Sequence, residues 1–175
     1  LGPRLATGTT AFDTLLPLVR GQRIGLFAGS GVGKSSLLAK FARGVQADVV
    51  VIALIGERGR EVGEFVRHTL GNTGMARSVV VTATSDQPAL MRRRCAWAAM
   101  TVAEHFRDLG LQVLLLADSV TRFAEAHREI ALAAGEAASL RGFPPSMAYE
   151  IMSLAERAGP GADGSGGAHG GDGDR

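Results

Sequence analysis

Four short stretches of almost purely apolar residues stand out along the chain, and each is bounded by glycine or by polar residues. They comprise residues 24–28, 49–55, 79–83 and 113–117. Continuous apolar runs of this length are typical of strands buried on both faces, whereas strands with one solvated face alternate apolar and polar residues. The pattern therefore predicts four strands of a parallel sheet.

The segments between these strands have the spacing of apolar residues that is typical of helices. Crossover helices are expected over residues 34–43, 60–70 and 89–109. Strands and helices then alternate along the chain, which indicates an α/β fold. Its crossovers are expected to be right-handed, as they are in nearly all parallel sheets.

Two more helices are expected after the fourth strand. One covers the alanine-rich residues 121–134 and the other covers residues 146–158. Pro144 and Pro145 fix the loop between them, because proline restricts the backbone. Ser146 is the expected N-cap of the second helix.

The two ends of the chain differ from this pattern. Residues 1–20 are interpreted as an irregular lead-in with a short helical turn around residues 12–16. Residues 21–158 form the expected core. Residues 159–175 are rich in glycine and aspartate, a composition that buries too little apolar surface to offset the loss of chain entropy. We expect this tail to be disordered.

Composition narrows the class of protein only modestly. The chain has 175 residues, of which 46% are hydrophobic and 21% charged, and this is typical of one ordinary globular domain. A formal net charge of +2 does not by itself indicate a nucleic-acid partner. The single cysteine, Cys95, cannot form an internal disulfide and is expected to pack in a helix, so a reducing cytoplasm fits best.

The strongest candidate for chemistry follows the first apolar stretch. Residues 28–35 read Ala-Gly-Ser-Gly-Val-Gly-Lys-Ser and lead into a helix, which is the context of a phosphate-binding P-loop. Glycines allow the backbone to approach phosphates closely, and the helix N-terminus directs partial positive charge at them. Lys34 is expected to reach the β- and γ-phosphates, and Ser35 to ligate Mg²⁺. The residues expected to contact the nucleotide are Gly29, Ser30, Gly31, Val32, Gly33, Lys34, Ser35 and Ser36.

Two features leave room for another interpretation of this loop. The general P-loop pattern has glycine at its first position and this chain has Ala28, which still fits if φ there is negative. The alternative is a glycine-rich turn between strand and helix that binds no ligand. We favour the P-loop because of its place in the chain.

Acidic residues follow two of the predicted strands. Asp118 ends the fourth strand, and carboxyl ends of parallel strands face one crevice, so it is the expected water-mediated partner of Mg²⁺. Glu57 follows the second strand and is the expected catalytic carboxylate that positions the attacking water. In the alternative reading, Glu57 or Glu61 caps the following helix, a role that suits Glu61.

Several consecutive segments together resemble the type III protein-export ATPases, most closely the flagellar export ATPase. This family is related to the catalytic subunits of rotary ATP synthases. The segments are GQRIGLFAGSGVGKSSLL, ALIGERGREVGEF, ATSDQPALMR, LLLADSVTRFAEAHREIALAAGE and RGFPPS. The resemblance covers about residues 7–161, and the Ala28 form of the P-loop is typical of that family.

This resemblance implies a RecA-like fold, Mg-ATP as ligand and a homohexameric ring at the cytoplasmic face of the inner-membrane export apparatus, with export substrates and chaperones as partners. It implies catalysis by Glu57, with Lys34 and Ser35 on phosphate and metal and Asp118 on the metal side. Arg58 would lie near a subunit interface. Arg122 would lie near the nucleotide and the neighbouring subunit. Residues 141–146 would face the central channel.

The chain also departs from the family pattern. Family members have an N-terminal β-barrel and a C-terminal helical domain that have no counterpart here, so the sequence is interpreted as a partial catalytic domain. The family's arginine finger and adenine-packing aromatic residue also have no donor in this sequence. Loss of an arginine finger costs about 10³–10⁵ in turnover. We therefore expect the isolated chain to bind Mg-ATP and to hydrolyse it weakly or not at all.

Three other functions were weighed. A catalytic subunit of a proton- or sodium-driven ATP synthase is the nearest alternative, and a non-hydrolysing ring subunit is disfavoured because Glu57 is present. An RNA translocase would need a basic patch, but residues 92–94, three consecutive arginines, cannot share one helix face. His68, His105 and His127 lack the spacing of metal ligands, and Trp97 and Phe106 are expected in the core.

Overall fold

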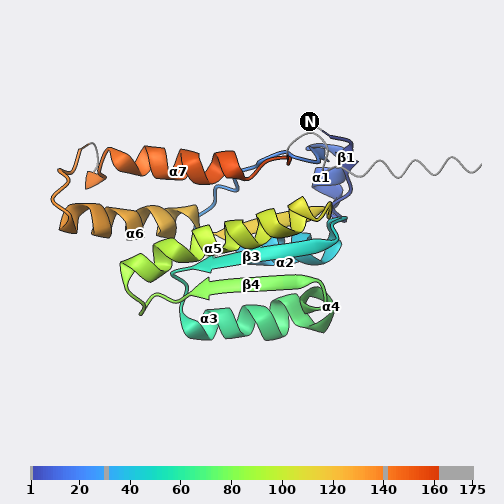
Figure 1. The fold of residues 1–175 in the computed structure, drawn as a ribbon. Helices are drawn as coiled ribbons and strands as arrows, with labels where there is room; N and C mark the ends of the chain where they lie inside the picture. Colours follow the sequence, from blue (N-terminus) through green and yellow to red (C-terminus); the bar gives the residue numbers. More distant parts are fainter. Residues whose placement is uncertain (1, 30–31, 140–141, 162–175) are drawn as a thin grey trace, which may run out of the picture.

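A three-stranded parallel sheet lies at the centre of the structure, a computed structural model that describes residues 2–29, 32–139 and 142–161 (Figure 1). Strand β3 (Val49–Ile55) lies between β4 (Ser78–Ala83) and β5 (Val113–Asp118). Residues Val50 to Ile55 are all buried, because β3 has a neighbour on each edge and a layer on each face. Three of the four predicted strands are therefore confirmed.

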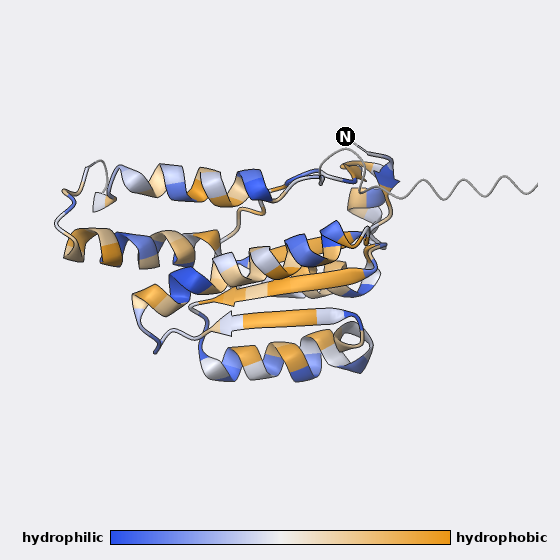
Figure 2. Cartoon of the chain, viewed as in Figure 1, coloured by the Kyte–Doolittle hydropathy of each residue, from blue (hydrophilic) through white to orange (hydrophobic). Residues whose placement is uncertain are grey.

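Alternate side chains of β3 enter two separate hydrophobic clusters. Val50, Ile52 and Leu54 pack in one cluster with α2 (Lys34–Gly44) and η1 (Phe65–Leu70). Val51, Ala53 and Ile55 pack in the other with α5 (Ala89–Asp108). This division follows from the period of two along a strand and explains why the whole run is apolar, as Figure 2 shows for β3 and β4.

The remaining helices extend these two layers. The predicted helix over residues 60–70 forms as a longer segment of three parts, α3 (Gly59–Glu64), η1 and α4 (Gly71–Met75). On the other side, α6 (Val120–Ala133) packs on α5, and α7 (Ser146–Arg157) packs on both (Figure 1). Cys95 is buried in this layer, and Trp97 and Phe106 are partly buried against it, as expected. No helix in the described ranges combines the length and hydropathy that a membrane span needs.

The N-terminal segment has more structure than the sequence indicated. Strand β1 (Arg4–Leu5) pairs with β2 (Leu18–Val19) in an antiparallel ladder, and the chain between the two strands forms α1 (Thr10–Thr14). The helical turn thus begins two residues before the predicted range. Thr7 is fully buried and donates to Asp13 through its backbone nitrogen and its hydroxyl, at 2.8 and 2.9 Å. These hydrogen bonds lower the pKa of the Asp13 carboxyl.

The predicted first strand, residues 24–28, is wrong for this chain. The segment belongs to none of the described sheets, and the side chains of Ile24 and Phe27 are 43% and 98% exposed. An apolar run becomes a strand only when a neighbouring backbone accepts and donates its hydrogen bonds. Within the described residues, β5 is an edge of the sheet and pairs only with β3, so this segment has no strand beside it.

The cap of α7 also differs from the prediction. Ser146 is the first helical residue rather than the N-cap, which is Pro145. Its backbone nitrogen instead donates to the Glu136 carboxylate, 2.9 Å away, which does the work of a cap from the preceding loop. The predicted disorder of the tail concerns mostly residues 162–175, which lie outside the described residues.

Candidate functional site

The N-terminus of α2 lies where the glycine-rich loop ends. Gly33 has φ of +89°, a left-handed conformation that glycine adopts without strain, and α2 begins at the next residue, Lys34. Ser35 and Ser36 are exposed on the first turn of the helix. Gly29 and Val32 are exposed as well, whereas Ser30 and Gly31 lie outside the described residues.

Lys34 and Asp118 meet across the end of the sheet. The ammonium nitrogen of Lys34 lies 2.7 Å from Oδ1 of Asp118, and the two side chains are 32% and 7% exposed. The two oppositely charged groups therefore form an ion pair. It brings together the first residue of α2 and the last residue of β5, as the sequence predicted.

Glu57 lies at the carboxyl end of β3, in the same region. Leu54 of β3 pairs with Asp118 of β5, so that Glu57 follows closely beyond the end of the paired strands. Burial raises the pKa of the Glu57 carboxyl, and a hydrogen bond to Glu61 and the charge of Asp118 raise it further, whereas Arg122 lowers it. Glu57 thus senses the charge of Asp118.

Glu61 lies in the first turn of α3, as its predicted role near a helix start requires, although no side chain caps this helix by a hydrogen bond. Arg58 immediately precedes α3 and its side chain is 75% exposed, with a 3.6 Å ion pair to Glu61. Arg58 therefore points away from the buried side of the site.

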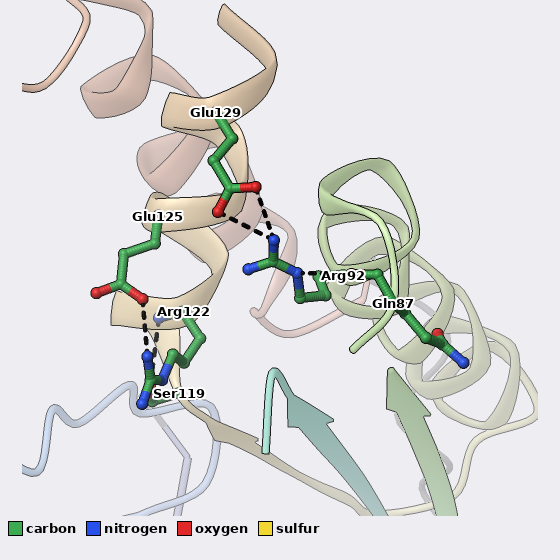
Figure 3. Close-up of polar contacts among 6 residues, drawn as sticks. All are labelled: Gln87, Arg92, Ser119, Arg122, Glu125 and Glu129. Atoms are coloured by element: carbon green, nitrogen blue, oxygen red, sulfur yellow. Dashed lines mark hydrogen bonds and ion pairs between the residues drawn. The ribbon is translucent and has the colours of Figure 1, made fainter. Parts of the chain in front are cut away.

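Arg122 enters the site from α6. A Cβ atom on Gly56 would lie 3.3 Å from the Cβ of Arg122, so that the arginine stem passes close over the residue before Glu57. The backbone nitrogen of Arg122 donates to the Ser119 hydroxyl, which caps α6, and its guanidinium pairs with Glu125 at 3.1 Å (Figure 3). These local contacts hold Arg122 beside Glu57.

An ion pair braces α5 against α6 beside Arg122. The guanidinium of Arg92 donates to both carboxylate oxygens of Glu129, at 3.0 and 2.8 Å, and to the carbonyl oxygen of Gln87 at 3.1 Å (Figure 3). In the sequence, residues 92–94 are only a run of basic residues, and nothing there indicates this contact. Charged residues on two separate helices give no pairing signal in one sequence.

The donors present fit a magnesium ion bound with phosphates. Mg²⁺ prefers oxygen ligands and is usually held by one or two carboxylates together with substrate phosphates. Asp118 supplies a buried carboxylate, and Ser35 supplies a hydroxyl one residue beyond Lys34. The described residues hold no group of three or more metal-ligating side chains, which such a site does not require.

A hollow of about 420 Å³ lies beside the loop. It is lined by residues 25–28, Val32, Gly33, Lys34 and Leu37. His68 and His105 are exposed on helices, whereas His127 is buried and contacts Arg93 and Ser146 through its ring nitrogens.

Comparison with known proteins agrees with this geometry. The chain is 57% identical over 161 residues to a type 3 secretion system ATPase of Xanthomonas euvesicatoria, and 56% identical over 160 residues to the flagellum-specific ATP synthase of Rhizobium meliloti. These alignments cover 92% and 91% of this chain but only 36% and 34% of the relatives. The chain thus spans about a third of the length of these relatives.

Solved structures show the same fold. A prototypical ATPase from the type III secretion system of pathogenic bacteria superposes with a TM-score of 0.88 at 51% identity, over 92% of this chain and 46% of that one. The assembled ATPase EscN of enteropathogenic E. coli, in complex with its central stalk EscO, superposes with a TM-score of 0.89, over 93% of this chain and 40% of that one.

The family model of the ATP synthase alpha/beta nucleotide-binding domain matches residues 8–169. The match includes the loop before α2, Glu57 and Asp118, the same residues that the structure brings to one end of the sheet. The chain therefore belongs to the ATP synthase alpha/beta family, of which it carries the nucleotide-binding domain.

Proposed function

We propose that this chain binds Mg-ATP and forms the catalytic core of a type III protein-export ATPase of the flagellar kind. The observation that supports this most directly is the meeting of Lys34 with Asp118 at the start of α2. A cation at a helix N-terminus next to a buried acid suits a triphosphate with its metal. The names of the relatives, a secretion ATPase and a flagellum-specific ATP synthase, support the same assignment.

Each residue of the site would have a separate role in the transfer of the phosphoryl group to water. Lys34 stabilises the negative charge that develops on the β- and γ-phosphates, and the backbone amides of residues 29–33 and of Ser35 and Ser36 cradle the phosphates. Asp118 and Ser35 would hold Mg²⁺, which supplies further neutralisation of phosphate charge when it is bound. Arg122 would add positive charge from the start of α6.

Glu57 would orient the water that attacks the γ-phosphate in line. Its raised pKa makes the carboxylate a better proton acceptor than an ordinary glutamate, because burial and the nearby acids disfavour its charge. A carboxylate at this position favours a hydrolytic subunit over a ring member that only binds nucleotide.

The proposal on assembly is supported by a relative rather than by contacts of this chain. EscN is described as an assembled ATPase in complex with a central stalk. We propose that this chain acts in a homohexamer at the cytoplasmic face of the inner-membrane export apparatus, where it delivers export substrates and their chaperones. Ring ATPases commonly need an arginine from a neighbouring subunit. Turnover by the isolated chain is therefore expected to be low, although it should bind Mg-ATP.

Binding and turnover of ATP by three proteins test this function: the wild type, Lys34→Ala and Glu57→Gln. Lys34→Ala should abolish detectable binding, because it removes the cation that faces the phosphates. Glu57→Gln should bind Mg-ATP as tightly as the wild type and lose whatever hydrolysis the wild type shows. Equal binding by Lys34→Ala and the wild type would contradict the proposal.

A further inference from the structure

We propose that Asp118 holds the ammonium of Lys34 as an internal substitute for the metal ion, so that the site discriminates against nucleotide that arrives without Mg²⁺. This inference rests on the proposed function and adds to it a form of regulation of the same site. It assigns to Asp118 a role before nucleotide binds, in addition to its expected place beside the metal.

The ion pair carries the argument. Nζ of Lys34 lies 2.7 Å from Oδ1 of Asp118, and only 7% of the Asp118 side chain is exposed. A buried carboxylate is costly unless a positive charge compensates it. Lys34 provides that compensation in the structure, and it does so from the helix N-terminus where phosphates are expected.

Lys34 cannot serve the carboxylate and the phosphates equally well at the same time. When it turns to a triphosphate, Asp118 is left in a poorly solvated position without its cation, which opposes binding. Mg-ATP removes this obstacle because it brings a replacement cation to the acid. Metal-free ATP leaves the acid unpaired and adds its own negative charge nearby.

The side chain of Lys34 is 32% exposed, so it can turn from Asp118 to another anionic partner.

Equilibrium binding of ATP to the 175-residue chain, by calorimetry with excess Mg²⁺ and again with EDTA, tests the inference. The wild type should bind far more tightly with Mg²⁺. Asp118→Asn frees Lys34 and should bind metal-free ATP about tenfold more tightly than the wild type, the effect expected of releasing a partly buried ion pair. The same variant should lose affinity for Mg-ATP. Its affinities for ATP with Mg²⁺ and with EDTA should therefore differ less than those of the wild type.

Glu57→Gln is the matched control, because it also removes one negative charge from the site but leaves the Lys34 and Asp118 pair intact. It should change the affinity for metal-free ATP by less than about threefold. The inference is overturned if Asp118→Asn gains no affinity in EDTA, or if Glu57→Gln gains as much. If the wild type binds no Mg-ATP at all, the proposed function fails instead, so the two failures are distinguishable.

Thermal unfolding without nucleotide provides a second, independent measurement. Lys34→Met should lower the melting temperature, because it leaves Asp118 buried and unpaired. The double variant Lys34→Met with Asp118→Asn should recover most of that loss. Additive effects of the two substitutions would show that the pair does not exist in solution and would overturn the inference.

Discussion

The imidazole Nε2 of His127 lies 2.7 Å from the hydroxyl oxygen of Ser146, and that hydroxyl donates to the Glu136 carboxylate at 2.6 Å. Arg93 faces the other ring nitrogen of His127 at 3.2 Å. Because a guanidinium only donates, Nδ1 must accept and Nε2 must carry the proton. The contacts therefore form a directional chain of hydrogen bonds from α5 through α6 to the start of α7.

Ser146→Ala should destabilise the fold, because it leaves the buried N–H of His127 without its acceptor. The expected loss is about 1–3 kcal/mol, the cost of a buried polar group without a partner. Thermal unfolding should show a lower melting temperature. Ser153→Ala, a change on the same helix, is the control and should have little effect. Equal melting temperatures for the two variants would contradict the chain of hydrogen bonds.

Gly56→Ala should impair the site as well as the fold. Gly56 has φ of +71°, and a Cβ there would lie 3.3 Å from the Cβ of Arg122. The left-handed backbone alone costs alanine about 1–2 kcal/mol. Gly135→Ala is the control, because Gly135 has φ of +88° and open space around its Cβ position.

Both glycine variants should therefore lose similar backbone stability in thermal unfolding. Only Gly56→Ala should displace Arg122 and lower ATP turnover beyond the effect of Gly135→Ala. Turnover that falls equally in the two variants would show that Arg122 has no dependence on Gly56.

The pH dependence of hydrolysis should report the environment of Glu57. With Glu57 in its proposed role, hydrolysis needs this carboxylate deprotonated, so the weak turnover expected of the chain should fall as the pH is lowered through its raised pKa. Glu61→Gln removes one carboxyl that raises this pKa, and it should move the acidic limb of the pH profile of kcat to lower pH. Glu64→Gln on the same helix should leave the limb in place. A shift to higher pH in Glu61→Gln would contradict this account.

Arg92→Ala should loosen α6 from α5. Its side chain is only 14% exposed, and one guanidinium nitrogen donates to both carboxylate oxygens of Glu129, so we expect a loss of about 1–2 kcal/mol in the free energy of unfolding. Arg94→Ala, a change at an exposed neighbour, should cost less than about 0.5 kcal/mol. Chemical denaturation of both variants measures the difference, and equal losses would show that the brace is not stabilising.

The strands at residues 49–55, 79–83 and 113–118 were predictable because each is a continuous apolar run that pairs within the chain. The same signal failed at residues 24–28, because composition reports the tendency to be buried but not the presence of a partner strand. A hydrogen-bonded ladder is a relation between two segments, and one segment alone cannot reveal it.

The candidate site was predictable to about the same extent as the strands. The glycine-rich loop and the acids after two strands could be found because carboxyl ends of parallel strands meet at one edge. The contacts of Glu136 with Ser146 and of Arg92 with Glu129 could not be found, because they depend on how separate helices and loops pack. The reason for a glycine at position 56 could likewise not be found from the sequence, because it depends on the close approach of the Arg122 side chain.

The most direct measurement is an experimental structure of the chain with Mg²⁺ and a non-hydrolysable ATP analogue. The account predicts that Lys34 leaves Asp118 for the phosphates, that the metal lies between the phosphates and the side of the site formed by Ser35 and Asp118, and that Glu57 faces the γ-phosphate. A nucleotide bound elsewhere, or a site in which Glu57 and Asp118 lie on the far side of the sheet from Lys34, would contradict it.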